Sequence, residues 1–101
     1  PRLIQLLASS SDLGTKRAIV IAFAEFAVLK ENQILLAQKS LGLAALIRRQ
    51  GDHHDFEFPV YLFFLNCAAS SGETHDYLLS EEVGFAMYAR GHLLRVPDNI
   101  F

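Results

Sequence analysis

The sequence has a single cysteine and no tryptophan among its 101 residues. One cysteine excludes an internal disulfide, which favours a reducing compartment, the cytoplasm or the nucleus. Long hydrophobic runs are missing as well. The longest, Ala18 to Ala24 and Val60 to Leu65, are far below the roughly 20 residues that a membrane span requires. With no signal peptide or lipidation motif in view, we expect no membrane insertion.

Catalytic and nucleic-acid signatures are also missing. We find no Ser-His-Asp order, no Gly-rich phosphate loop and no isolated carboxylate pair, so we expect neither an enzyme nor a cofactor. The net charge of −2 implies no strongly electrostatic partner, and we expect no nucleic acid. Half of the residues are apolar, which is typical of a packed domain and not of a disordered chain. The length allows one domain.

β-Hairpin signals do not occur either, because the chain has no Asn-Gly or Asp-Gly dipeptide. The run Val60 to Phe64 lacks the alternation of a half-buried strand, and we interpret it as a buried helix. A lone buried strand is the alternative there, since Val, Tyr and Phe favour sheets.

The chain does contain an internal repeat. Residues 31–48 can be laid over residues 73–90 at a constant offset of 42, and five identities result: Glu31/Glu73, Leu36/Leu78, Gly42/Gly84, Ala44/Ala86 and Arg48/Arg90. A second match, at an offset of 41, relates 23–27 to 64–68. A period near 42 residues is typical of stacked helical repeats.

Local signals predict a series of helices over 1–9, 15–29, 30–40, 43–49, 59–69, 73–82 and 85–95. Ser11 or Asp12 is the expected N-cap of the second helix. Pro59 should make the second long helix begin late or bend near Phe58. We expect Gly42 and Gly84 to adopt positive φ where one short helix gives way to the next.

Three helices per repeat, two short and one long, resemble the armadillo family. Residues 1–10, Pro-Arg-Leu-Ile-Gln-Leu-Leu-Ala-Ser-Ser, are similar to the second helix of an armadillo repeat. Residues 22–27 and 63–68 resemble the end of the third helix, and 32–42 resembles the first. A HEAT-type array is the alternative, but it lacks the short first helix. The resemblance implies an all-α, right-handed α-solenoid. It would form one domain over 1–101 with a partial repeat at 1–29, a full repeat at 30–70, a partial repeat at 71–95 and a tail or next helix at 96–101. We expect the chain to be a piece of something longer.

The resemblance has departures. Armadillo proteins that hold extended peptides typically carry a Trp and an Asn one turn apart on the third helix. Here those positions hold Ile21 with Glu25, and Leu62 with Asn66, which argues against recognition of nuclear signals.

The two long helices are predicted to have one core face and one open face. Spacings of three and four residues assign Ile19, Ala22, Phe23 and Phe26 to the core, with Val60, Phe63, Phe64 and Cys67 as their counterparts. The opposite face also includes Ala24, Val28 and Ala69. In an armadillo stack it lines the concave surface, and we assign a partner-binding groove to seven of its residues: Arg17, Ile21, Glu25, Phe58, Leu62, Leu65 and Asn66. Burial of this face against neighbouring repeats is the alternative.

Other reactive or charged residues have ordinary interpretations. We expect Cys67 to be a buried small hydrophobe, because a catalytic thiol needs an exposed, electropositive site. His53 and His54, with Asp52 and Asp55, suggest a solvated loop more than a metal site, and His75 and His92 suggest surface residues. Arg48, Arg49, Arg90 and Arg95 suit the ends of short helices, and the acidic residues Glu73, Asp76, Glu81 and Glu82 suit a solvated face.

The function expected from these features is a non-enzymatic scaffold or adaptor that binds a protein segment on its concave face. The alternative is a structural segment whose apolar faces pack on other repeats or on a second copy, so that a homo-oligomer is possible.

Overall fold

The computed structural model describes residues 2–68 and 75–95, with side chains described as far as Gly91. Within these ranges the fold is all-helical, and Val60 to Phe64 is helix. The elements in chain order are α1 (Arg2–Ser9), α2 (Leu13–Phe26), α3 (Lys30–Leu36), η1 (Lys39–Leu41), α4 (Leu43–Gln50), η2 (His54–Phe56), α5 (Glu57–Ala68), α6 (His75–Leu78) and α7 (Phe85–Arg95). Predictions for Pro1, for 69–74, for 96–101 and for the side chains of His92 and Arg95 lie outside the described residues.

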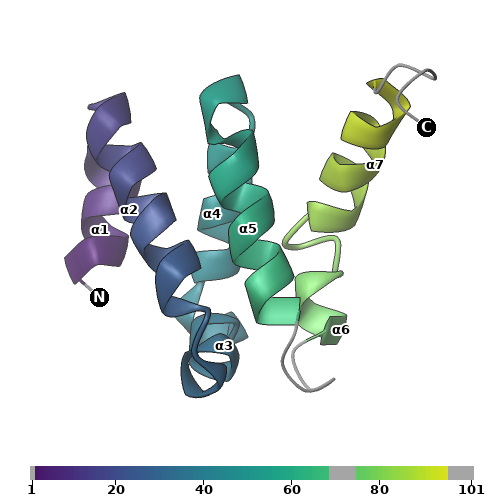
Figure 1. Ribbon diagram of the computed structural model, residues 1–101, viewed down its shortest axis with the longest axis horizontal. Coiled ribbons are helices and arrows are strands. Elements are labelled where there is room, and N and C mark those ends of the chain that lie inside the picture. The colour runs from purple at the N-terminus through teal and green to yellow at the C-terminus, as the bar shows by residue number, and fades with distance from the viewer. Residues whose placement is uncertain (1, 69–74, 96–101) are drawn as a thin grey trace.

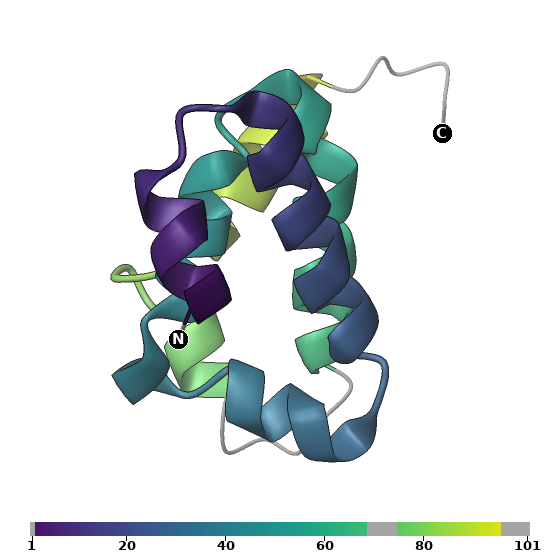
Figure 2. The same cartoon turned by 90° about the vertical axis from the view of Figure 1, so that its left-hand side faces the viewer.

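The two long helices, α2 and α5, lie side by side and form one layer of the molecule (Figure 1). Figure 2 shows a second layer, formed by α1 and α4, with α3 below the two layers. The helix α1 packs on α2, and α5 packs on α2, α3 and α4. In Figure 1, α7 lies on the side of α5 that is opposite to α2. The long helices therefore place the predicted groove residues on one layer.

Capping by Asp12 explains why α2 starts where it does. The carboxylate of Asp12 accepts a hydrogen bond from the Thr15 N–H at 3.0 Å, the standard arrangement of an N-cap. Two hydrogen bonds lower the pKa of Asp12 below its usual value. The larger effect comes from the Thr15 hydroxyl and the smaller from the Thr15 N–H. The expected cap is confirmed at Asp12.

Pro59 delays α5, as expected. At an offset of 41 the first residue of α2 corresponds to His54, yet α5 begins only at Glu57, and the 3₁₀ turn η2 occupies the interval. Pro59 then lies in the first turn of α5, where a missing N–H costs nothing because the first four N–H groups of a helix have no partner within it.

The predicted bounds of two short helices, 30–40 and 73–82, were wrong, because both observed helices end earlier. The first ends at Leu36 and is followed by the separate 3₁₀ turn η1, and the second ends at Leu78. Beyond α6 the Ser80 hydroxyl donates to the Tyr77 carbonyl at 2.6 Å, which offers the backbone an alternative to continued helix. Nothing in the sequence before Gly42 marks the corresponding stop after α3.

Gly42 and Gly84 confirm the expected positive φ, at 70° and 78°. Each precedes a helix, α4 or α7, and its carbonyl accepts the hydrogen bond from the residue four positions later, Leu46 or Tyr88. The two glycines thus have the same conformation and the same role at positions 42 residues apart.

Replacing Gly42 by valine should lower the free energy of unfolding by roughly 1–3 kcal/mol, the usual cost of a side chain in a restricted backbone region. A Cβ atom there would meet no atom of the described residues within 4 Å apart from those of its two chain neighbours, so the loss would come from the backbone alone. Urea denaturation followed by circular dichroism measures it. Gly42→Asn is the matched control, because Asn tolerates positive φ better, and equal losses in both variants would contradict this reason.

The core lies between the layers and includes Val20, Phe63, Val60 and Cys67, each with no exposed surface. Three of the predicted face assignments on α2 are wrong. Phe26 is 47 % exposed, Ala22 is only half-buried, and Ala24, which we expected on the open face, is fully buried. The reason is that α5 packs along one side of α2, and this shifts the buried stripe toward Val20 and Ala24.

Candidate interaction face

The seven predicted groove residues lie on neighbouring helices at matching positions. Three come from α2 at a spacing of four, and Phe58, Leu62 and Asn66 repeat that spacing on α5 at an offset of 41. None of the seven is buried, and Phe58 and Leu65 are 73 % and 65 % exposed. We call these seven residues, Arg17, Ile21, Glu25, Phe58, Leu62, Leu65 and Asn66, the α2–α5 face. Whether this face binds a partner stays a prediction.

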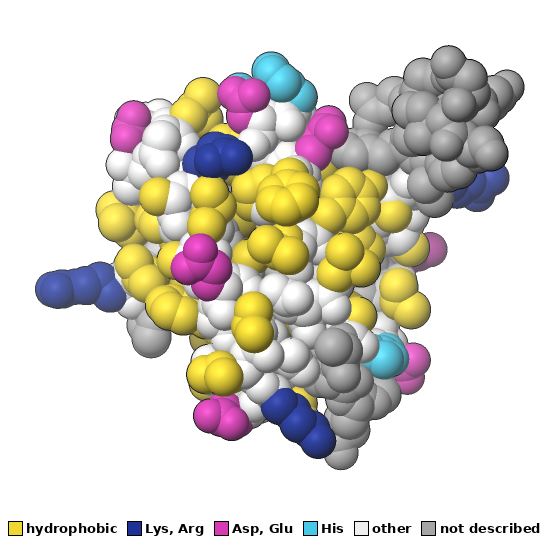
Figure 3. Space-filling view, in the orientation of Figure 1, with side chains coloured by type: hydrophobic (Ala, Val, Ile, Leu, Met, Phe, Trp, Pro, Cys, Tyr) yellow, Lys and Arg dark blue, Asp and Glu magenta, His cyan; other side chains and the backbone are white. Residues whose placement is uncertain are grey.

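Hydrophobic side chains gather over the layer formed by α2 and α5, with few charged groups among them (Figure 3). Exposed hydrophobic residues also occur elsewhere on the molecule, among them Leu3, Leu6, Leu13, Leu35, Leu79 and Met87. Exposure alone therefore does not single out the α2–α5 face. What sets this face apart is that two adjacent helices contribute residues at equivalent positions, 41 residues apart in the sequence.

Two polar residues of this face tie α2 to α5 and to the turn η2 that precedes it. The side-chain amide of Asn66 donates to the carbonyl of Ala24 at 2.9 Å. Near the other end of the pair, Nε of Arg17 donates to the carbonyl of Asp55 at 3.1 Å. One N–H of the Asn66 side chain is therefore bonded to a neighbouring helix. This contact was not predicted from the sequence, because Asn66 and Ala24 are 42 positions apart.

Cys67 lies in the core behind this face, as expected, with no exposed surface. Burial raises the pKa of its thiol to about 12, so the nucleophilic thiolate form is scarce near neutral pH. The environment is that of a small core residue.

Labelling of Cys67 by a thiol reagent should be much slower in the native protein than in urea, because both burial and the high pKa oppose reaction. The measurement compares the rate of thiol modification in buffer and in denaturant at mildly alkaline pH. Complete native labelling at the rate of the denatured chain would show that the thiol is accessible, and would contradict the assignment of Cys67 to the core.

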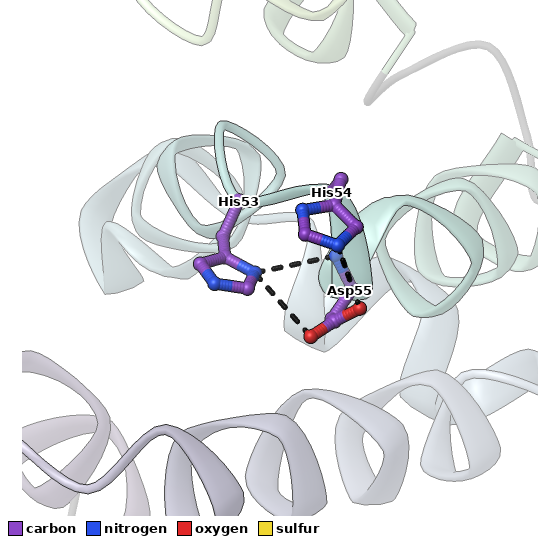
Figure 4. Close-up of side chains that lie close together, drawn as sticks. All are labelled: His53, His54 and Asp55. Atoms are coloured by element: carbon purple, nitrogen blue, oxygen red, sulfur yellow. Dashed lines mark hydrogen bonds and ion pairs between the residues drawn. The ribbon is translucent and has the colours of Figure 1, made fainter.

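His53, His54 and Asp55 lie close together before α5 (Figure 4), and each can offer one ligand atom within 4.8 Å of the others. Local bonding accounts for this cluster. Nδ1 of His53 accepts the Asp55 N–H at 3.2 Å, so this lone pair is in use, and Nε2 of His54 lies 3.2 Å from a carboxylate oxygen of Asp55. The two imidazole rings stack with centroids 5.0 Å apart. Three consecutive residues could give at most three ligands at the surface, and we propose no metal here.

A second cluster, around Tyr88 of α7, was not predicted. The Tyr88 hydroxyl donates to the carbonyl of Gly51 at 3.0 Å, and burial raises the pKa of Tyr88 to about 12. The guanidinium of Arg48 lies 5.3 Å from the centre of the Tyr88 ring and also pairs with Asp52 at 2.9 Å. Arg48 and Arg49 do occupy the last turn of α4, as expected. The cluster joins α7 to α4 and has the contacts of a structural element.

None of the helices in the described ranges combines the length and the apolar character that crossing a membrane requires. Comparison with protein-family models, with curated proteins and with solved structures finds no significant match to this chain.

Proposed function

We propose that the chain is a non-enzymatic protein–protein interaction module, an armadillo-like scaffold segment that binds a peptide or helix of a partner on the α2–α5 face. The observation that carries the proposal is the pairing of equivalent residues on two adjacent helices: Arg17, Ile21 and Glu25 beside Phe58, Leu62 and Asn66. Arg17, Glu25 and Phe58 are exposed, and the other three are half-buried. The equivalent conformations of Gly42 and Gly84 support the repeat on which the armadillo interpretation depends.

The chemistry of this face suits a partner with apolar anchors. Phe58 and Leu65 are largely exposed, and burial of such side chains is worth about 25 cal/mol per Å² of apolar surface removed from water. Arg17 and Glu25 at one edge could set the orientation of a charged segment. An apolar face of this kind is typical of peptide or helix recognition and not of nucleic-acid binding. The single cysteine is in keeping with the cytoplasm or the nucleus.

The test is a pull-down with Phe58→Lys and Leu65→Lys. Both residues are exposed, so both variants should fold, and each should lose the proteins that the parent chain retains. Leu35→Lys is the matched control, because Leu35 is 54 % exposed but lies on α3, outside the face. Retention of the same partners by both face variants would overturn the assignment. Asn66 is a poor test position because its amide ties α5 to α2.

A structural or self-associating role is the second candidate. It is favoured by the exposed apolar residues at the α1–α2 end, Leu3, Leu6 and Phe26. Phe26 is 47 % exposed although its counterpart Cys67, at an offset of 41, is fully buried. Light scattering over a range of concentrations distinguishes the two candidates, since a monomer at high concentration speaks against self-association.

A further inference from the structure

Arg17 and Glu25 carry opposite charges on one stripe of α2, eight residues apart, with Ile21 midway between them. Eight residues of α-helix rise about 12 Å. Both charged residues are exposed, and in the described ranges neither takes part in an ion pair. The guanidinium of Arg17 donates from Nε to the carbonyl of Asp55. Because a guanidinium has five N–H donors, its terminal nitrogens can still meet a carboxylate.

The two long helices run in the same direction (Figure 1). Arg17 bonds to the turn before α5, and Asn66 bonds to Ala24 near the end of α2, so the two helices are level with each other. Leu62 on α5 is therefore at the level of Ile21 on α2, as the offset of 41 requires. Figure 2 shows no element of the described residues over the outer side of this layer.

The charges of this face are self-complementary under a twofold axis. In a symmetric dimer, if residue i meets residue j, then j also meets i. An axis that lies in the plane of the face and crosses α2 at Ile21 stacks each long helix antiparallel on its own copy. Arg17 then meets Glu25 of the second copy, and Glu25 meets Arg17 of the second copy.

The other twofold axis in this plane does not pair the charges. An axis parallel to the helices would stack α2 on α5 of the second copy. Arg17 would then be level with Phe58, and Glu25 with Asn66, so neither charge would meet an opposite one at its own level. Charge complementarity therefore favours the antiparallel arrangement.

We propose that the α2–α5 face binds a second copy of the chain, with each long helix antiparallel to its own copy. The proposal rests on the proposed function, because it uses the same face, and it names the partner. The middle of the interface is apolar and includes Phe58 and Leu65, which are 73 % and 65 % exposed in the single chain. Burial of apolar surface stabilises the dimer, and two equivalent pairs of Arg17 with Glu25 fix its orientation.

The test reverses the two charges, and sedimentation equilibrium over a wide range of concentrations measures the result. The parent chain should form a dimer. Glu25→Arg sets arginine against arginine at both ends and should weaken the dimer about tenfold or more, because two attractive pairs become repulsive. Arg17→Glu sets glutamate against glutamate and should have the same effect. The double variant Arg17→Glu/Glu25→Arg has opposite charges again and should recover the dimer.

A mixture of the two single variants tests the register. Arg17→Glu and Glu25→Arg should form a dimer with each other, because position 17 of each chain then meets an opposite charge at position 25 of the other. Arg17→Glu also loses the hydrogen bond to the Asp55 carbonyl, and circular dichroism checks that it is folded. Glu25→Arg loses no such contact, so its effect tests the dimer even if Arg17→Glu does not fold.

Leu6→Lys is the matched control, because Leu6 is 43 % exposed but lies at the α1–α2 end, on which the second candidate function depends. It should dimerise like the parent chain. A parent chain that stays monomeric, or equal association of the parent chain and Glu25→Arg, would overturn the proposal. Loss of the dimer in Leu6→Lys would do so too, by moving the contact to the α1–α2 end. The proposed function is judged separately, from the partners that Phe58→Lys loses in the pull-down.

Discussion

Replacement of Phe63 by alanine should lower the free energy of unfolding by about 3–5 kcal/mol, the range for removal of a fully buried phenylalanine. Phe63 has no exposed surface, and its ring packs edge to face on Phe64 with centroids 5.4 Å apart. It lies on α5, the helix that contacts most of the others. The cavity left behind would therefore lie at the junction of several helices.

The matched control is Phe58→Ala, the same change in the same helix. Phe58 is 73 % exposed, so its loss should alter stability by no more than about 0.5 kcal/mol. Urea denaturation followed by circular dichroism measures both variants. Similar losses for the two would mean that α5 is not oriented as the structure has it.

Gly51→Ala should also be strongly destabilising, although Gly51 has an ordinary φ of −66°. A Cβ atom at this position would lie 2.5 Å from the Tyr88 hydroxyl oxygen and 2.7 Å from its Cζ atom. The ring cannot move aside freely, since Tyr61 and Phe85 pack against it with centroids 5.4 and 6.2 Å away. We expect a loss of roughly 1–3 kcal/mol from overpacking, and about 1 kcal/mol more if the hydrogen bond to the Gly51 carbonyl breaks.

Gly91→Ala provides the control with the opposite sign. A Cβ atom at Gly91, within α7, would meet no atom of the described residues within 4 Å beyond the local backbone of its own helix, and alanine is the better helix former by roughly 0.5–1 kcal/mol. Gly91→Ala should therefore raise the melting temperature while Gly51→Ala lowers it. A neutral Gly51→Ala variant would show that Tyr88 is not held against α4.

Features that depend on neighbouring residues could be predicted from the sequence. The bounds of the last helix, Phe85 to Arg95, the cap at Asp12 and the φ angles of Gly42 and Gly84 all agree with expectation. Each depends on chemistry within a few residues: a carboxylate three positions before an N–H, or a glycine between two helical segments. The ends of α3 and α6 were missed because sequence periodicity continued past the point where the backbone turns.

Features that depend on distant contacts could not be predicted. The spacing on α2 indicated two faces, but which of Ala24 and Phe26 is buried depends on the side from which α5 approaches. Tyr88 contacts Gly51, which is 37 positions away, and Asn66 contacts Ala24, which is 42 positions away. No local sequence pattern predicts either contact. The α2–α5 face was predicted as a set of residues, and the structure adds that two of its members are also structural ties.

Those two ties determine how a partner would meet this face. They join α2 to the α5 region through Arg17 near one end and Asn66 near the other, at positions on α2 that are about 10 Å apart along the helix axis. Two attachments so separated oppose both sliding and rotation of one helix against the other. The face is thus preorganised, and a ligand would lose little affinity to the ordering of the protein. If this face binds a partner, as we propose, it would select that partner by its fixed shape, and sequences that need the two helices to separate would be rejected.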